Sequence, residues 1–280
     1  MVAIPKPEVT MIDKIYAAIE KKLTRPFRLT RIGASGIGNP CLRAIWYDWR
    51  GYDSVKFDGR MRRLFETGEH QEVRIQQDLQ LAGYQVWTHD DEGNQFTATD
   101  ETGHFVCKLD GVIKGVNGAE KTPHDLEIKT HSFKSFDEVQ KKGVEKAKPM
   151  HFYQMQAGMI YHKLPRALYV ALNKNNEAYH IERIYPDETV QRDVKTKITK
   201  LVEARMIPVG ISPDGNNFDC KWCDMRGVCV EGKKPIKTCR SCEHAEPQPQ
   251  NGEWLCTHHG HVTTSQEQLE ACPDYEVKTL

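Results

Sequence analysis

The sequence lacks any run of about 18 apolar residues, the length an α-helix needs to cross a membrane. Its first residues, MVAIPKPEVT, also lack the apolar stretch of a signal peptide. No internal repeat and no low-complexity tract is visible. These absences argue against a membrane-spanning or fibrous protein. They predict a cytoplasmic location, with no membrane among the partners.

The composition is that of a globular chain with a sizeable core: 280 residues, 39% hydrophobic and 28% charged. The net charge is zero, but the two signs are unevenly placed. Residues 1–65 carry 13 Lys or Arg against 6 Asp or Glu, whereas residues 237–280 carry 3 against 7. A basic N-terminal part suits a polyanionic partner, and it is equally typical of a solvated surface. Nine cysteines in a cytoplasmic chain indicate metal ligands more than disulfides.

Hydrophobic periodicity predicts a mixture of helices and strands, and therefore an α/β (α+β) fold. Helical spacing is present at 10–23, 41–52, 61–84, 149–164 and 187–205, with a charged helical connection at 134–146. Strand patterns occupy 84–90, 94–99, 104–113, 124–130, 166–173 and 178–186.

An Asn-Gly turn signal at 117–118 predicts a hairpin between two of these strands. A turn centred there pairs positions whose numbers sum to about 236, which sets Asp110 opposite about residue 126 and near Glu127. Lys129 lies two residues beyond Glu127 and so projects from the same face. Two carboxylates and an ammonium group can hold a divalent cation and activate water. The same pattern is also typical of a solvated ion pair.

Asp110 followed by Glu127-x-Lys129 resembles the core of the PD-(D/E)xK nuclease superfamily. The preceding LFETGEHQE resembles the glycine-bearing helix of its RecB-like and phage lambda exonuclease branches. This resemblance implies a restriction-endonuclease-like core with a mixed central sheet flanked by helices. It places Glu72, or alternatively His70, beside Asp110 and Glu127 as a ligand of Mg²⁺ or Mn²⁺, with Lys129 supporting the attacking water.

HFYQMQ, after the core, resembles the glutamine-bearing helix of the same branches. Gln154 takes the family's position, with Gln156 as the neighbouring candidate. The Gln-x-x-x-Tyr form of RecB-like enzymes is not reproduced, since Tyr161 lies seven residues after Gln154. The resemblance implies a metal-dependent exonuclease acting on linear or single-stranded DNA in recombination, repair or phage DNA processing. Its catalytic residues would be Glu72, Asp110, Glu127, Lys129 and Gln154.

The segment 220–229, CKWCDMRGVC, places three cysteines at C-x2-C-x5-C spacing, and thiolates this close converge on a soft metal centre. Cys41, far upstream, is the available fourth. The arrangement resembles the CRISPR-associated and AddB-type iron–sulfur nucleases, in which one cysteine before the core and three after it hold a [4Fe–4S] cluster. The implied cluster ligands are Cys41, Cys220, Cys223 and Cys229.

A second set makes a self-contained four-thiolate site, for which Zn²⁺ is the default ion: Cys239, Cys242, Cys256 and Cys272. A zinc-ribbon set also fits the spacing, namely Cys220, Cys223, Cys239 and Cys242. One of His258, His259 and His261 could replace Cys272, or all three are surface residues. Cys107 shares a strand face with Phe105 and Leu109, which predicts a core position.

Four segments are predicted. Residues 1–64 form an N-terminal helical region with the first cluster cysteine, 65–211 the nuclease core, 212–232 the iron–sulfur segment and 233–280 a zinc module. The zinc module is acidic, so we expect it to dock a protein of a recombination or adaptation complex and not to bind the DNA backbone. Its CRSCEH…WLC…C pattern is similar to phage-encoded nucleases.

The basic residues of 21–63 could guide a single strand together with Trp46, Tyr47 and Trp49, unless these aromatic residues belong to the core. Two other functions fit the same fold. One is a non-catalytic DNA-binding or scaffold protein, and the other is a structure-selective endonuclease of replication or recombination.

Overall fold

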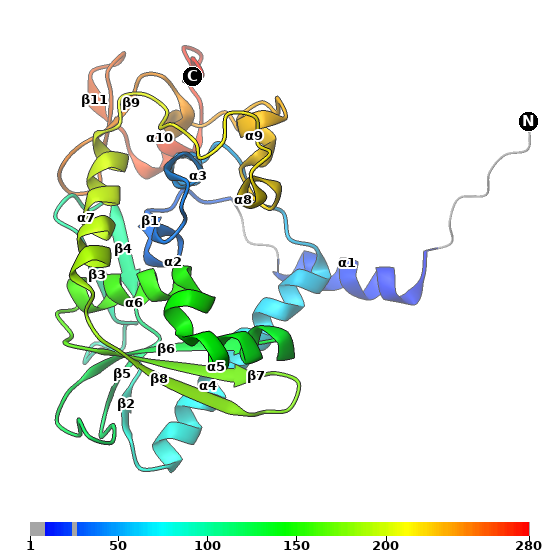
Figure 1. Cartoon of the computed structure of the whole chain (residues 1–280). Helices are drawn as coiled ribbons and strands as arrows, with labels where there is room; N and C mark the ends of the chain where they lie inside the picture. Colours follow the sequence, from blue (N-terminus) through cyan, green and yellow to red (C-terminus); the bar gives the residue numbers. More distant parts are fainter. Residues whose placement is uncertain (1–8, 24–26, 280) are drawn as a thin grey trace, which may run out of the picture.

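The computed structural model describes residues 9–23 and 27–279 (Figure 1). Its centre is a five-stranded sheet of order β2-β5-β6-β7-β8. Only β6 and β7 run parallel, and the other neighbours are antiparallel. The strands are β2 (Gln85–Trp87), β5 (Gly111–Lys114), β6 (His124–His131), β7 (Ala167–Asn173) and β8 (Tyr179–Ile184).

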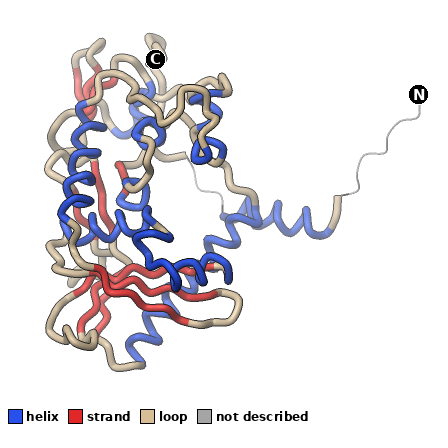
Figure 2. Tube along the Cα trace, in the orientation of Figure 1, coloured by secondary structure: helices blue, strands red, loops and turns tan. Residues whose placement is uncertain are grey.

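Helices cover both faces of this sheet, which confirms the predicted α/β class with a mixed central sheet (Figures 1 and 2). On one face, α4 (Gly59–Leu81) packs through Ile75 and Leu79 against Leu126 and Ile128. On the other face lie α5 (Phe133–Ala147) and α6 (Pro149–Tyr161). Successive residues of a strand point to opposite faces, so the alternating pattern of β6 serves both layers.

Two smaller sheets complete the fold. The first has the order β1-β4-β3 and the second the order β11-β10-β9. Their strands are β1 (Ile32–Gly33), β3 (Thr97–Thr99), β4 (Phe105–Lys108), β9 (Ala245–Pro247), β10 (Trp254–Cys256) and β11 (His261–Val262). The remaining helices are α1 (Met11–Leu23), α2 (Ala34–Ile37), α3 (Leu42–Trp49), α7 (Glu188–Glu203), α8 (Phe218–Lys221), α9 (Arg226–Val230), the 3₁₀ helix η1 (Cys239–Ser241) and α10 (Ser265–Leu269).

The predicted strand at 104–113 is two strands in two different sheets. β4 ends at Lys108, and β5 begins at Gly111 in the central sheet, so the chain changes sheets at Leu109 and Asp110. The hairpin register differs from the prediction by one residue, since Gly111 pairs with Leu126 and Ile113 with His124. The turn around Gly118 sets this register through the bond from Ala119 N to Val116 O.

The hydrophobic core does not follow the predicted segments. Helix α4 begins at Gly59, capped by Asp58, so the predicted division between residues 64 and 65 falls inside it. One cluster joins the N-terminal region, β4, α7 and both cysteine-rich segments. Its buried members include Trp46, Phe105, Leu201, Met225 and Trp254. The segments after residue 211 therefore share a core with the rest of the chain.

The close approach of α6 to β6 depends on Gly158. A Cβ at this position would overlap the Oδ2 atom of Asp125, whose side chain is fully buried. We expect Gly158→Ala to lower the free energy of unfolding by about 1–3 kcal/mol in urea titrations, because overpacking forces β6 and α6 apart.

Gly68→Ala is the matched control for this substitution. Gly68 is also helical, but a Cβ there meets no atom within 4 Å. Alanine is favoured over glycine in a helix by about 0.5–1 kcal/mol, so the control variant should be no less stable than the unchanged chain. Equal stability of the two variants would contradict this account of the α6–β6 contact.

Candidate active site and metal centres

A row of polar side chains lies on the face of β6 that is covered by α5 and α6. Asp125, Glu127, Lys129 and His131 occupy alternate positions, so they share this face. Asp125 and Glu127 are each only 1% exposed. A carboxylate at this depth is costly unless a charge or hydrogen bonds compensate it. The neighbours of the row therefore decide what it can do.

Asp110 joins this row from the start of β5. Its Oδ2 atom accepts a hydrogen bond of 2.9 Å from the backbone N–H of Ile128 and lies 3.7 Å from Lys129 Nζ. The same Nζ forms an ion pair with Oε1 of Glu127. The exposed fraction rises from 2% for the Glu127 side chain to 17% for Asp110 and 28% for Lys129. The cluster is therefore closed at Glu127 and open to solvent at Lys129.

Helix α4 adds a third carboxylate to the cluster. Gln76 Nε2 donates to the backbone carbonyl of Asp110 at 2.9 Å and to Glu72 Oε1 at 3.3 Å, one helical turn away. His70 lies two residues before Glu72, about 200° around the helix, and is exposed. Of the two predicted alternatives, the structure brings Glu72 to Asp110, and His70 points elsewhere.

The two candidate glutamines of α6 have different partners. Gln154 Nε2 donates to Glu127 Oε2 at 2.9 Å. Gln156 is fully buried, where its Nε2 donates to the carbonyl of Tyr185 and its Oε1 accepts from the N–H of Asp187. Gln154 therefore belongs to the cluster, and Gln156 holds the connection between β8 and α7.

The cluster shifts the pKa values of its members. Burial raises the pKa of Glu127 to about 7, although Lys129 opposes the shift. Burial and the charge of Asp110 raise the pKa of Glu72 to about 7. Burial lowers the pKa of Lys129, but the charges of Glu127 and Asp110 outweigh it and hold the pKa above its usual value. Three carboxylates compete for one ammonium group, and a bound cation would relieve their repulsion. These oxygen donors fit Mg²⁺ or Mn²⁺.

Sequence reasoning missed a polar chain behind the cluster. The Tyr169 hydroxyl lies 2.8 Å from His131 Nε2 and 2.8 Å from His151 Nδ1, and Ser135 Oγ lies 2.9 Å from His131 Nδ1. Burial lowers the pKa of His131 to about 4 and that of His151 to about 3, so both rings are neutral near pH 7. Extending the alternation of β6 by two residues would have found His131. These hydrogen-bonded side chains connect α6 to the central sheet, close to Gln154 on the same helix.

The first set of cysteines lines one cavity of about 470 Å³. Cys41 caps the start of α3, Cys220 belongs to α8, Cys223 follows it, and Cys229 lies in α9. Arg43 Nη1 lies 3.8 Å from Cys229 Sγ. The structure therefore brings the distant Cys41 to the three cysteines of 220–229.

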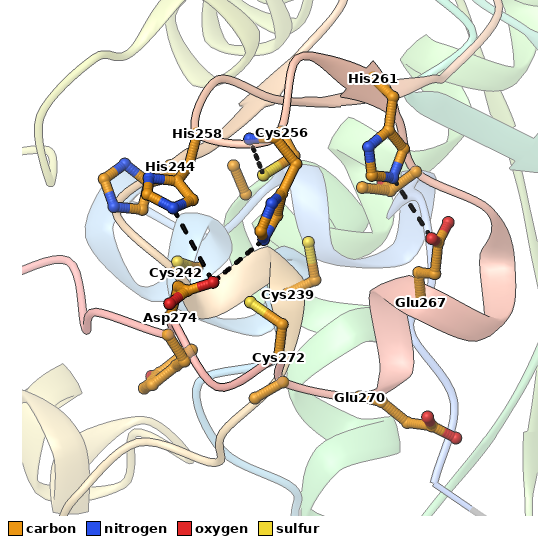
Figure 3. Close-up of a pocket in the computed structure, with 15 residues that line it drawn as sticks. Cys239, Cys242, His244, Cys256, His258, His261, Glu267, Glu270, Cys272 and Asp274 are labelled. Carbon is orange, nitrogen blue, oxygen red and sulfur yellow. Dashed lines mark hydrogen bonds and ion pairs between the residues drawn. The ribbon is translucent and has the colours of Figure 1, made fainter.

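The second set of cysteines lines another cavity of about 180 Å³ (Figure 3). Burial and the neighbouring thiols raise the pKa of Cys239 to about 11. The backbone N–H of His259 donates to Cys256 Sγ at 3.4 Å. The set consists of Cys239, Cys242, Cys256 and Cys272. The zinc-ribbon combination is not formed, because its two halves line different cavities. Cys107 is fully buried in the core beside Phe105 and Leu109, as expected.

Within each of the three sets, the two thiolate sets and the carboxylate cluster, the side chains lie near one another. They do not converge as closely as the ligands of a bound metal ion would. Within residues 9–23 and 27–279, no three ligand atoms of these sets lie within 4.8 Å of one another. The donor types suit a soft centre in each thiolate set and a hard cation at the carboxylates. Binding of an ion would draw the side chains together, which couples each centre to the folding of its segment.

Two alternatives were open for three aromatic residues, stacking on DNA or a position in the core, and the structure places them in the core. Trp46, Tyr47 and Trp49 are 0–3% exposed and belong to the hydrophobic core. Their helical spacing places them on the face of α3 that packs against α7 and the C-terminal segment. They have no face left for a base to stack on.

No protein-family model matches the chain, and no curated protein matches it significantly. Among solved structures, it is similar to LHK-Exo, an alkaline exonuclease from Laribacter hongkongensis, at 19% identity and a TM-score of 0.41 over 68% of this chain and 92% of that one. LHK-Exo in complex with dAMP is similar at 16% identity and a TM-score of 0.43, over 68% of this chain and 90% of that one. The protein SSO0001 is similar at 14% identity and a TM-score of 0.42, over 79% of this chain and 98% of that one. Similarity at this level assigns no function to the chain.

Glu127→Gln tests the buried charge directly. The pKa of Glu127 is about 7 in the folded chain against a usual 4.5, so its contribution to stability is present below pH 4.5 and is lost as pH rises through 7. Relative to Glu127→Gln, the unchanged chain should therefore lose on the order of 2 kcal/mol in the free energy of unfolding between pH 5 and pH 8. Urea titrations with a chelator measure this difference.

Glu92→Gln provides the control for this pH dependence. Glu92 is an exposed carboxylate in the turn between β2 and β3, away from the cluster, so its replacement should leave the pH dependence of the unchanged chain intact. If Glu127→Gln showed the same dependence on pH as the unchanged chain, the buried carboxylate would not carry the effect.

Proposed function

We propose that the chain is a metal-dependent deoxyribonuclease of the PD-(D/E)xK type that hydrolyses phosphodiester bonds in DNA. One observation carries the proposal: Asp110, just before β5, meets Glu127 and Lys129 of β6 at one partly open cluster. Glu72 adds a carboxylate from α4, and Gln154 orients Glu127 from α6. An ordinary exposed ion pair would have neither the buried carboxylate nor the converging partners.

The residues of the cluster divide the chemistry. Asp110, Glu127 and Glu72 would hold Mg²⁺ or Mn²⁺, which supplies charge for the phosphate and lowers the pKa of bound water. Because burial raises the pKa of Glu127 to about 7, its carboxyl group would lose its proton near neutral pH on binding a cation. Lys129 stays protonated between Glu127 and Asp110 and presents its ammonium group at the open side. From there it donates hydrogen bonds to an attacking water or to charge developing on the phosphate.

We assign exonuclease action on DNA ends or single strands, in recombination, repair or phage DNA processing, as the form of the activity. The surplus of basic side chains in residues 1–65 supports a DNA substrate. A structure-selective endonuclease would cut circular or branched DNA as well as linear DNA. A non-catalytic scaffold is disfavoured, because binding alone needs no buried carboxylate at a cost in stability.

The two thiolate sets are proposed to hold different centres. Cys41, Cys220, Cys223 and Cys229 would hold a [4Fe–4S] cluster, for which four thiolates are the usual ligands. The second set, lining the smaller cavity, would hold Zn²⁺. The cluster would join α3 to α8 and α9, segments nearly 180 residues apart in the chain, so its role is structural. The acidic zinc-binding segment would dock a protein partner.

Lys129→Ala tests the proposed catalysis. The purified variant should degrade linear DNA with Mg²⁺ or Mn²⁺ more than about 100-fold more slowly, because the charge at the open side of the cluster is lost. Lys141→Ala is the control, since Lys141 is an exposed lysine paired with Asp137 on α5. Circular dichroism confirms folding of both. Full activity in both Lys129→Ala and Asp110→Ala would refute the proposal.

Substrate topology tests the exonuclease assignment separately. The unchanged chain should digest linear DNA and leave covalently closed circles intact, as gel electrophoresis would show. Cutting of circles at the same rate would favour the endonuclease alternative instead.

Metal analysis of anaerobically purified protein tests the two thiolate centres. The unchanged chain should contain iron and zinc and absorb near about 400 nm. Cys41→Ala should lose iron and the absorption but keep zinc, and Cys242→Ala should lose zinc but keep iron, because the sets line different cavities. Cys107→Ala, in the core, should keep both. Two zinc ions without iron would overturn the cluster assignment.

A further inference from the structure

Two histidines and an aspartate converge beside the second set of cysteines. The Nε2 atoms of His258 and His259 lie 3.8 and 3.6 Å from Asp274 Oδ2. One ligand atom from each of the three side chains lies within 4.8 Å of the other two. Among the residues that the structure describes, no other group of three such ligand atoms is this compact. All three side chains are exposed and line the cavity of about 180 Å³, where Figure 3 labels His258 and Asp274.

The fold holds this group through two turns that also carry cysteines. His258 and His259 lie in the turn between β10 and β11, where Gly260 N donates to the carbonyl of Cys256 at 2.8 Å. The N–H of His259 donates to Cys256 Sγ. On the other side, Tyr275 N donates to the carbonyl of Cys272, in the turn that contains Asp274. The contacts that hold the thiols in place therefore also hold the imidazoles and the carboxylate.

The donor set differs from both centres proposed above. Imidazole nitrogen with one carboxylate oxygen suits Zn²⁺, Co²⁺ or Ni²⁺, whereas Mg²⁺ prefers oxygen alone and an iron–sulfur cluster prefers thiolates. The rings of His244 and His258 lie 5.0 Å apart and those of His258 and His259 4.8 Å apart. Exposure leaves room for water on the remaining positions.

We propose that His258, His259 and Asp274 bind one divalent transition-metal ion, separate from the thiolate set and from the carboxylate cluster. Solvent completes its coordination, so the ion exchanges more readily than one enclosed by four thiolates. The proposal stands independently of nuclease activity. The proposed site lies at the surface of the acidic C-terminal segment, in the turns that follow Cys256 and Cys272.

Cobalt titration of the full, metal-stripped chain tests this site. Equilibrium dialysis counts the bound Co²⁺, and the near-ultraviolet thiolate-to-cobalt absorption reports the cysteine centres independently. His259→Ala and Asp274→Asn should each bind one Co²⁺ fewer than the unchanged chain, with unaltered thiolate absorption. The affinity of that site should fall by more than about 100-fold, because even loss of an outer partner of a ligand costs 10–100-fold.

His261→Ala is the matched control, because His261 is an exposed histidine of the same segment that lies against Glu267 and not Asp274. It should keep the additional ion. Two results would overturn the proposal. One is an unchanged count and affinity in both His259→Ala and Asp274→Asn. The other is a parallel loss of thiolate absorption, which would assign these side chains to the cysteine centre.

Discussion

The buried ion cluster on β6 is the constraint on which the central architecture depends. Glu127 is nearly inaccessible, and its charge is compensated by Lys129 on the same strand and by Gln154 on α6. Asp110, which repels Glu127, is held in place by the backbone N–H of Ile128 and shares Lys129. Removing a partner from such a group leaves a buried charge uncompensated, at a cost of about 3–5 kcal/mol. The strands and helices around the cluster must therefore keep their relative positions for the chain to be stable.

Helix α6 meets the polar row of β6 at successive turns. Gly158 leaves room for Asp125, Gln154 bonds Glu127, and His151 reaches Tyr169 and through it His131. Spacings of three and four residues place these side chains on one face of the helix. A helix that serves a polar row in this way cannot shift by a turn without losing all three contacts, so it holds the candidate site to a narrow geometry.

The metal-ligand candidates outside the sheet follow a different principle. Cys41 and the cysteines of 220–229 come from segments that are distant in sequence and share one hydrophobic cluster with β4 and α7. Packing of that cluster brings the thiols to one cavity before any ion is considered. In the C-terminal segment, four thiols and several imidazoles line the same cavity, so one small fold presents two kinds of donor.

The sequence by itself determined the type of most elements and the shared face of Glu127 and Lys129, because alternation along a strand is a local property. It also indicated the Asn-Gly hairpin and a core position for Cys107. Only the tertiary structure shows that Glu72 and not His70 lies toward Asp110, that Gln154 and not Gln156 reaches Glu127, and which cysteines line the same cavity. These choices depend on which neighbour a side chain faces, and periodicity within one element carries no such information. The same limit left two alternatives open for Trp46, Tyr47 and Trp49: helical spacing shows that they share a face, and only packing against the rest of the chain decides whether that face meets solvent.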